Sequence, residues 1–307
     1  RMSYDGFIST NDDASHCKKY AVSKGYWFDP YIDLFVTSSP GRKTPEISRG
    51  YYIRHWCIKS LVEQFLLKTN CQCQIVNLGA GFDTLFWNIL EKQLEPKHGF
   101  YEIDMPQVVK KKKSIILSKL QLNKSFLSEK VRTTDLTLDT DTYHLMACDL
   151  REVKSIDASL CAAGISKKVP TLILAECVFV YMDTSSISKL LNYFTEEFPI
   201  VLLADYDPIN LNDKFGEVMR QNLSQRNCPL LGAFPDIQSK KQFYKVFSDV
   251  NIKLLSDVYN NLPSNDKQRI ERLEFLDEVD LLYEMLRHYS ISWSYNAPAG
   301  LLDTLKL

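Results

Sequence analysis

Residues 74–84, with the sequence QIVNLGAGFDT, limit what this chain can fold into more than any other segment. The segment begins with an apolar run that includes Ile75, Val76 and Leu78. Because apolar residues fall on both faces of this run, it predicts a strand that is buried on both sides, as in a parallel sheet covered by helices. The chain is therefore expected to contain an α/β core.

A tight turn with two glycines follows the predicted strand. Gly79 and Gly81 have no Cβ atom, so the backbone can bend sharply there and a ligand can come close to it. A helix is expected to begin near Thr84, with Asp83 or Thr84 as the residue that caps it, and we favour Asp83. What this turn binds is the main question for function.

Strands and helices alternate through the middle of the chain. Further strands are expected at residues 99–103, 144–148, 169–175 and 199–204. Helices are expected at residues 46–68, 84–91, 107–120 and 184–197. This alternation predicts an α/β fold with a doubly wound, mostly parallel sheet.

The ends of the chain depart from this pattern. Residues 1–15 are polar and are expected to form a loose arm, and residues 121–142 are expected to be irregular. Residues 252–258 and 286–294 have strand character and are expected to extend the sheet at an antiparallel edge. We expect a single domain over residues 1–307, made of an N-terminal helical segment (1–68), a cofactor-binding core (69–208), a candidate cap over the site (209–245) and the last part of the sheet (246–307).

Composition argues against several classes of partner. The formal net charge is −1, whereas proteins that bind nucleic acid usually carry a basic excess. The sequence has no apolar run of about 20 residues, so no membrane span is indicated. The eight cysteines are scattered, some of them in apolar stretches, which favours reduced thiols and a cytoplasmic protein. We expect a monomer.

Three local clusters receive structural interpretations. Cys71 and Cys73 form a C-x-C pair with no second pair and no histidine nearby, so no metal site is predicted. The lysine run at residues 110–113 is interpreted as the solvated face of a helix. The aromatic run at residues 26–35 is interpreted as packing rather than as a substrate groove.

Acidic residues stand at or just beyond the carboxyl ends of the five predicted strands. They are Asp83, Asp104, Asp149, Glu176 and Asp205. Ligands of doubly wound sheets bind outside these strand ends. Several carboxylates along one edge, around a glycine turn, therefore indicate a site for a nucleoside-like ligand whose hydroxyl and amino groups need partners.

Two cofactors compete for this site. Gly79-Ala80-Gly81 is a G-x-G turn, but Thr84 stands where a dinucleotide fingerprint has its third glycine. S-adenosylmethionine has no phosphate and tolerates that loss, and its ribose diol could meet Asp104. The pattern favours S-adenosylmethionine over NAD, with a non-catalytic Rossmann-like domain as a third possibility.

At this point the chain resembles a known family along nearly its whole length. The matching segments are NLGAGFDT, YEIDMP, ACDL, LAECVFVYM, CKKYAVSKGYWFDPY, EISRGYYIR, NDKFG and LEFLDEVDLL. Together they resemble the leucine carboxyl methyltransferases, most closely those that methyl-esterify the C-terminal leucine of the protein phosphatase 2A catalytic subunit. The resemblance implies a class I methyltransferase (Rossmann-like) fold, S-adenosylmethionine as donor, S-adenosylhomocysteine as product and a protein tail as acceptor.

The same resemblance implies a set of site residues. By motif, the cofactor contacts of the family fall on Lys18, Arg54, Gly79, Asp104, Asp149, Leu150 and Glu176. Asp104 would accept hydrogen bonds from the ribose, Asp149 and Leu150 would meet the adenine, and Glu176 would hold the α-amino group of the donor.

Catalysis is expected to need positioning only. Lys18, Arg54 and Tyr181 are the residues expected to hold the carboxylates of the donor and the acceptor. A terminal carboxylate is already ionised at neutral pH, so no general base is required.

Two other functions stay open at the level of the sequence. A related branch methylates a carboxyl group on a modified tRNA base, but it carries a long C-terminal repeat domain and this chain stops at Leu307. The chain could also be a non-catalytic scaffold that binds the phosphatase. A scaffold would not bind S-adenosylmethionine.

Overall fold

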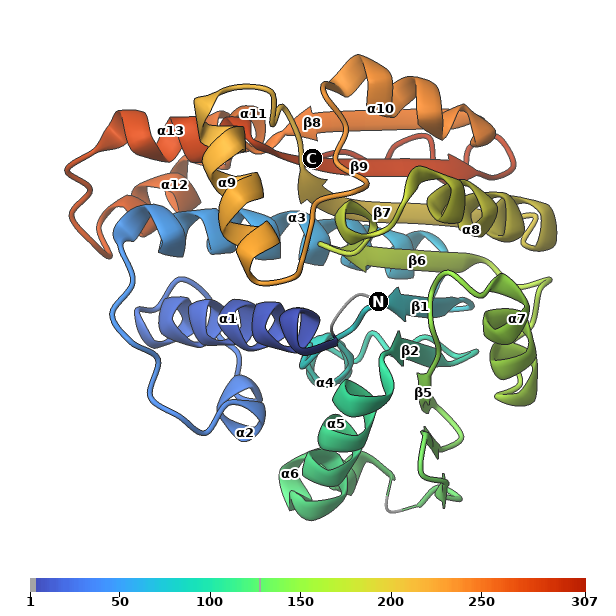
Figure 1. Ribbon diagram of the computed structural model, residues 1–307. Helices are drawn as coiled ribbons and strands as arrows, with labels where there is room; N and C mark the ends of the chain where they lie inside the picture. Colours follow the sequence, from blue (N-terminus) through green and yellow to red (C-terminus); the bar gives the residue numbers. More distant parts are fainter. Residues whose placement is uncertain (1–3, 127) are drawn as a thin grey trace.

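The computed structural model describes residues 4–126 and 128–307, and the side chains of residues 10–126 and 128–307. Its centre is one nine-stranded sheet in the order β3-β4-β5-β2-β1-β6-β7-β9-β8 (Figure 1). The five central strands are parallel and are β5 (Tyr143–Ala147), β2 (Phe100–Asp104), β1 (Gln74–Leu78), β6 (Thr171–Glu176) and β7 (Val201–Pro208). The predicted doubly wound, mostly parallel sheet is thereby confirmed.

The strand order reverses at β1, the strand on which the sequence argument began. From β1 the chain continues outward to β2 and β5, and then crosses back to β6 and β7 on the other side. All five residues of β1 are buried, as expected for a strand with neighbours on both edges and helices on both faces. The carboxyl end of β1 is therefore the topological switch point, where ligands of such sheets bind.

Both edges of the sheet are antiparallel. At one edge, β3 (Arg132–Thr133) and β4 (Thr137–Asp139) pair with each other and with β5, so the prediction that residues 121–142 are irregular is wrong for these short strands. They escaped prediction because two or three residues show no alternation.

At the other edge, β9 (Tyr289–Asn296) pairs with β7, and β8 (Asp249–Leu254) pairs with β9. The antiparallel extension is confirmed, but the strand predicted at 252–258 ends early. Helix α11 (Leu255–Asn260) begins directly after it.

Helices cover both faces of the sheet and enclose a separate apolar core on each. The first core lies under α3 (Pro45–Lys68), α4 (Leu85–Glu91), α5 (Pro106–Ser118), α11 and α13 (Val279–Arg287). The second lies under α7 (Val153–Ala162), α8 (Thr184–Glu197) and α10 (Ile237–Phe243). Short helices α2 (Ile32–Phe35), α6 (Leu120–Asn123) and α12 (Ser264–Glu271) lie in the connections.

The N-terminal segment is helical, which corrects the prediction of a loose arm at residues 1–15; residues 1–3 lie outside the described part. Helix α1 (Tyr4–Ser23) packs against α3 (Figure 1). Its later residues Tyr20 and Ala21 are buried, so tertiary contact rather than its own apolar pattern holds it in place.

The aromatic run at residues 26–35 packs mainly inward, as predicted. Tyr26, Tyr31 and Phe35 are buried, whereas Phe28 is 85% exposed. The lysine run at 110–113 differs from its prediction at one position, because Lys112 is completely buried.

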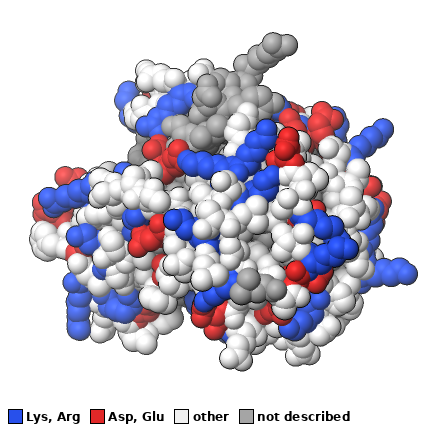
Figure 2. Space-filling view, turned by 90° about the horizontal axis from the view of Figure 1, so that it is seen from below, with Lys and Arg blue, Asp and Glu red and all other residues white. Residues whose placement is uncertain are grey.

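Charges on the visible surface are mixed. Figure 2 shows basic and acidic side chains interspersed on one face, in agreement with the near-neutral net charge. Within the part of the chain that the structure describes, no helix combines the length and apolar character needed to cross a membrane.

Candidate functional site

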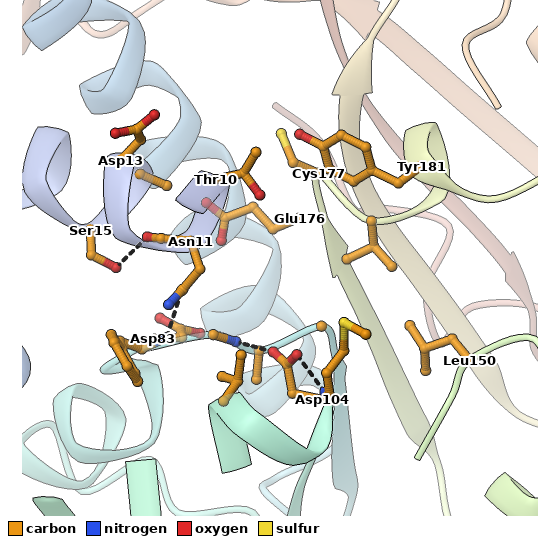
Figure 3. A pocket seen from close by; sticks show the side chains of 18 of the residues that line it. Thr10, Asn11, Asp13, Ser15, Asp83, Asp104, Leu150, Glu176, Cys177 and Tyr181 are labelled. Atoms are coloured by element: carbon orange, nitrogen blue, oxygen red, sulfur yellow. Dashed lines mark hydrogen bonds between the residues drawn. The ribbon is translucent and has the colours of Figure 1, made fainter. Parts of the chain in front are cut away.

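A cavity of about 360 Å³ opens at the carboxyl ends of β1, β2 and β6 (Figure 3). Its lining includes all eight residues predicted for the site. They are Lys18, Arg54, Gly79, Asp104, Asp149, Leu150, Glu176 and Tyr181. These residues come from six separate segments of the chain, and the fold brings them together at the switch point.

The glycine turn forms the floor of the cavity. Gly79 and Gly81 adopt left-handed backbone angles, with φ of +58° and +51°. A Cβ on Gly79 would lie 2.7 Å from Cγ2 of Val178, and a Cβ on Gly81 would overlap Oδ1 of Asn11. The turn therefore needs glycine at both positions, for its backbone angles and for space.

Asp83 lies one residue before Thr84, the N-cap residue of α4, whose side chain makes no capping bond, so the role of Asp83 differs from the predicted helix cap. Its Oδ1 accepts a hydrogen bond from the amide of Leu85 at 3.2 Å, at the start of α4. Its Oδ2 accepts a bond of 2.8 Å from the side-chain amide of Asn77. Asp83 thus links the helix start to β1 while it also lines the cavity.

Asp104 ends β2 and faces the same turn. Its two carboxylate oxygens accept hydrogen bonds of 2.6 Å from the backbone amides of Gly81 and Met105. Burial raises the pKa of Asp104, although these two amides oppose the rise. Each oxygen retains a lone pair, so the carboxylate can still accept a bond from a hydroxyl group in the cavity.

Glu176 ends β6 and binds two cations. Its Oε1 accepts a hydrogen bond from Nε of Arg54 and lies 3.0 Å from Nζ of Lys18. Burial by itself would raise the pKa of Glu176, but the charges of Arg54 and Lys18 outweigh it and lower the pKa to about 2. With Glu176 ionised, the three residues carry one net positive charge, which suits a ligand carboxylate.

Aromatic rings hold Arg54 in place. Its guanidinium lies 4.8 Å from the ring centre of Tyr206 and 5.3 Å from that of Tyr51. Cation–π contacts of this kind stabilise a desolvated guanidinium. Arg54 is therefore fixed by Tyr206 of β7 and the carboxylate of Glu176, and not by its helix neighbour Tyr51 alone.

Tyr181 and Cys177 lie on the side of the cavity opposite Asp104 (Figure 3). Burial raises the pKa of the Tyr181 hydroxyl, which stays protonated at neutral pH and can donate a hydrogen bond. Burial also raises the pKa of Cys177 to about 12, so this thiol is not a nucleophile, as the sequence predicted. Cys177 has a left-handed φ of +57°, an unusual angle for a residue with a side chain.

Asp149 has a partner that the sequence did not predict. Arg151, two residues later, donates to both of its carboxylate oxygens, and the Nη2–Oδ2 distance is 2.5 Å. This pair is partly exposed, and Leu150 lies beside it in the lining. Of the five acids predicted at strand ends, Asp205 does not line the cavity, because β7 continues to Pro208 and Asp205 lies inside the strand, where it pairs with Lys240 of α10.

Two helices supply lining residues that the sequence did not single out individually. From α1 come Thr10, Asn11, Asp13, Ala14 and Ser15, in addition to Lys18. From α9 (Lys214–Gln225) and the residue after it come Met219, Leu223 and Arg226. Arg226 pairs with Asp13 at 2.5 Å, so the two helices meet beside the cavity. Of the predicted cap, α9 lies at the site, whereas α10 packs against the second core.

The donor set fits an adenosyl amino acid. Asp104 offers acceptors for a diol, Glu176 an acceptor for an ammonium group, and Lys18 and Arg54 donors for a carboxylate. The side-chain nitrogen of Asn11 is buried and has no hydrogen-bond partner among the described residues, which leaves one more donor at the turn. At Gly79 and Gly81 no side chain stands between the backbone and the cavity.

Comparison with known sequences points to one family. Residues 6–195 match the model of the family described as leucine carboxyl methyltransferase. Leucine carboxyl methyltransferase 1 of Bos taurus is 37% identical over 298 residues, covering 94% of this chain and 90% of its own. The protein of the same name from Caenorhabditis elegans is 35% identical and covers 92% and 89%. tRNA wybutosine-synthesizing protein 4 of Rattus norvegicus is 31% identical over 92% of this chain but only 43% of its own.

Comparison with solved structures supports the fold. A proposed methyltransferase from Thermobifida fusca superimposes with a TM-score of 0.55 at 12% identity, over 87% of this chain and 93% of its own. A DUF574-family protein from Streptomyces avermitilis gives a TM-score of 0.52 at 11% identity, over 92% and 97%. At these identities the similarity concerns the fold alone, which is that of class I methyltransferases.

Proposed function

The chain belongs to the leucine carboxyl methyltransferase family, and from this we propose its reaction. We propose that it transfers a methyl group from S-adenosylmethionine to the C-terminal leucine carboxylate of the protein phosphatase 2A catalytic subunit, forming a methyl ester that regulates assembly of the phosphatase. The observation that carries the proposal is the 37% identity to leucine carboxyl methyltransferase 1 over 94% of the chain. The eight free cysteines fit a reducing compartment, and we place the reaction in the cytoplasm.

In this proposal the donor lies along the switch point. Asp104 holds the ribose, Asp149 and Leu150 bind the adenine, and the backbone at Gly79 lies under the amino-acid part. Glu176 accepts from the donor's α-amino group. Because Glu176 is ionised far below neutral pH, it can play this part at any physiological pH.

Lys18, Arg54 and Tyr181 hold carboxylates in the proposed reaction. The positive charge that remains after Glu176 is paired attracts an anionic group, and the neutral Tyr181 hydroxyl can donate to one oxygen of the acceptor while leaving the other to react. A terminal carboxyl group has a pKa of about 3.3–3.7, so it arrives ionised and needs no general base.

Exclusion of water is the remaining contribution of the protein. When bound, S-adenosylmethionine supplies an electrophilic methyl group on a sulfonium centre whose charge is lost in the transfer. The apolar lining around the cavity, including Met182, Met219 and Leu223, favours loss of charge and aligns the reacting groups. No protein side chain exchanges a proton with the reactants in this scheme.

The experiment measures transfer of a labelled methyl group. Purified chain, labelled S-adenosylmethionine and the phosphatase catalytic subunit should give a base-labile ester on the subunit. The same subunit without its terminal leucine is the matched control and should stay unlabelled. Transfer to tRNA in place of the subunit would support the carboxyl methylation of a modified base, and no binding of the donor at all would support a scaffold.

Substitution of Asp104 tests the proposed donor site. Asp104→Ala removes the carboxylate proposed to bind the ribose. Because a hydrogen bond to a charged group contributes about 1.5–3 kcal/mol of free energy, the affinity for S-adenosylhomocysteine should fall roughly 10- to 100-fold. Calorimetric titration measures this, with Asp135→Ala as control because Asp135 is an exposed acid outside the cavity. Equal affinity in both variants would refute the assignment.

A further inference from the structure

Lys112 on α5 is a buried charge that the proposed reaction does not use. Its side chain is completely inaccessible to solvent, and so is that of Glu102 on β2. Nζ of Lys112 lies 2.5 Å from Oε2 of Glu102. The same oxygen accepts a hydrogen bond of 2.5 Å from the hydroxyl of Tyr143.

A buried ion pair is not explained by stability alone. Removing two charges from water costs several kcal/mol, and apolar residues of similar volume are often at least as stabilising. Oε1 of Glu102 is also buried without a hydrogen-bond partner among the described residues. The pair is therefore expected to have a use that an apolar pair would not supply.

Lys112 makes a second polar contact that points to this use. Its Nζ donates a hydrogen bond of 3.0 Å to the backbone carbonyl of Asp83. Asp83 follows the glycine turn, and its carboxylate already accepts bonds from Asn77 and Leu85. The carbonyl of Asp83 is thus held from α5, and its carboxylate is held from β1 and α4.

Aromatic rings keep the ammonium group where it is. Nζ of Lys112 lies 5.7 Å from the ring centre of Phe35 and 6.0 Å from that of Trp87. These rings exclude water and attract the cation through their faces. With water excluded, the Asp83 carbonyl depends on Lys112 for its hydrogen bond.

We propose that Lys112 is a positioning residue that holds the turn from Gly79 to Asp83 in the shape that binds the donor, and that Glu102 offsets the free-energy cost of burying its charge. This inference rests on the donor site of the proposed function. Lys112 touches neither donor nor acceptor and acts through the carbonyl of Asp83. A neutral side chain of similar size would fill its space without this hydrogen bond.

The test separates positioning from stability with a charge-neutral double variant. Lys112→Met alone leaves Glu102 as an unpaired buried charge and should lower the melting temperature. Lys112→Met with Glu102→Gln removes both charges, keeps an acceptor for Tyr143 and should recover most of that loss. We expect the double variant still to bind S-adenosylhomocysteine roughly 10-fold more weakly, because the Asp83 carbonyl has lost its donor.

Glu102→Gln alone is the complementary variant. It retains the bond from Lys112 to Asp83, so its affinity for S-adenosylhomocysteine should stay within about twofold of the wild type even where its melting temperature falls. Lys110→Met, at an exposed position of the same helix, is the matched control. In turnover assays, the double variant should show a raised KM for the donor with a smaller change in kcat.

Each outcome decides whether Lys112 positions the turn or only stabilises the fold. A double variant that recovers stability and binds as tightly as the wild type overturns the inference. If the double variant does not fold, a Glu102→Gln protein whose affinity falls together with its stability overturns it as well. A wild-type chain that binds no S-adenosylhomocysteine would instead refute the donor site, and hence the proposed function.

Discussion

Two carboxyl groups near the end of β7, Asp205 and Asp207, are buried, and neither lines the cavity. Asp205 lies 2.6 Å from Nζ of Lys240 and accepts a further bond from Ser292. Asp207 accepts a long bond of 3.4 Å from the amide of Val180. Burial and the neighbouring Asp205 raise the pKa of Asp207 to about 8, although Lys240 opposes the rise.

This raised pKa predicts a dependence of stability on pH. An aspartate has an unfolded pKa of about 3.9, so the folded chain retains a proton on Asp207 that the unfolded chain releases. Its contribution is complete below about pH 4 and is lost as pH rises through about 8. Asp207→Asn keeps the oxygen that accepts from Val180 and abolishes the titration.

Urea unfolding at pH 5 and pH 8 measures the effect. Relative to the wild type, Asp207→Asn should gain about 1 kcal/mol or more between the two pH values. Asp135→Asn changes the same functional group at an exposed position and should gain nothing. An Asp207→Asn difference that is the same at both pH values would contradict the raised pKa.

At the scale of elements, α1 contributes most to the site beyond the core. Its polar residues line the cavity, and Oδ1 of Asn11 accepts a hydrogen bond of 3.1 Å from the amide of Phe82 in the glycine turn. Gly81 fits beneath Asn11 only because it has no Cβ. The packing of α1 and the shape of the turn are therefore coupled.

Gly81→Ala tests this coupling. The added methyl group is strained at a φ of +51° and displaces Asn11, so affinity for S-adenosylhomocysteine should fall and α1 should become more accessible. Trypsin cleavage at Lys18 and Lys19, measured over time, should accelerate several-fold. Gly164→Ala is the control, because Gly164 also has a left-handed φ of +88° but open space around its Cβ position. Equal cleavage in the two variants would show that α1 does not depend on the turn.

At the scale of the whole molecule, the sheet separates two apolar cores. Ile116 of α5 belongs to the first core and Ile156 of α7 to the second, and both are completely buried. A small loss of packing in one core should not change the stability of the other, because substitutions at side chains that share no partners have additive effects on the free energy of unfolding.

A double-mutant cycle measures this independence. Ile116→Val and Ile156→Val should each lower the free energy of unfolding by about 0.5–1.5 kcal/mol. The double variant should lose the sum of the two to within about 0.5 kcal/mol in urea unfolding. A larger coupling energy would mean that the sheet transmits packing changes between its faces.

The sequence by itself determined the α/β class, the central strands and the residues of the turn. Apolar runs such as that of β1 can be buried only between covered faces, and a turn like that at Gly79 and Gly81 admits few residue types. The grouping of acids at one edge of the sheet could also be predicted, because the carboxyl ends of parallel strands share that edge. Local pattern and strand polarity are enough for these features.

Only the tertiary structure decided which polar residues meet. Lys112 looks like its neighbours in a run of four lysines, and only the packing of α5 on β2 buries it beside Glu102. Asp205 follows the pattern of strand-end acids, yet β7 continues past it to Pro208, and its carboxylate pairs with Lys240 of α10. Helix α1 has a polar sequence and packs against α3 and the glycine turn. In each case the deciding partner is distant in sequence, and the free energy of burying a charge depends on that partner rather than on the local pattern.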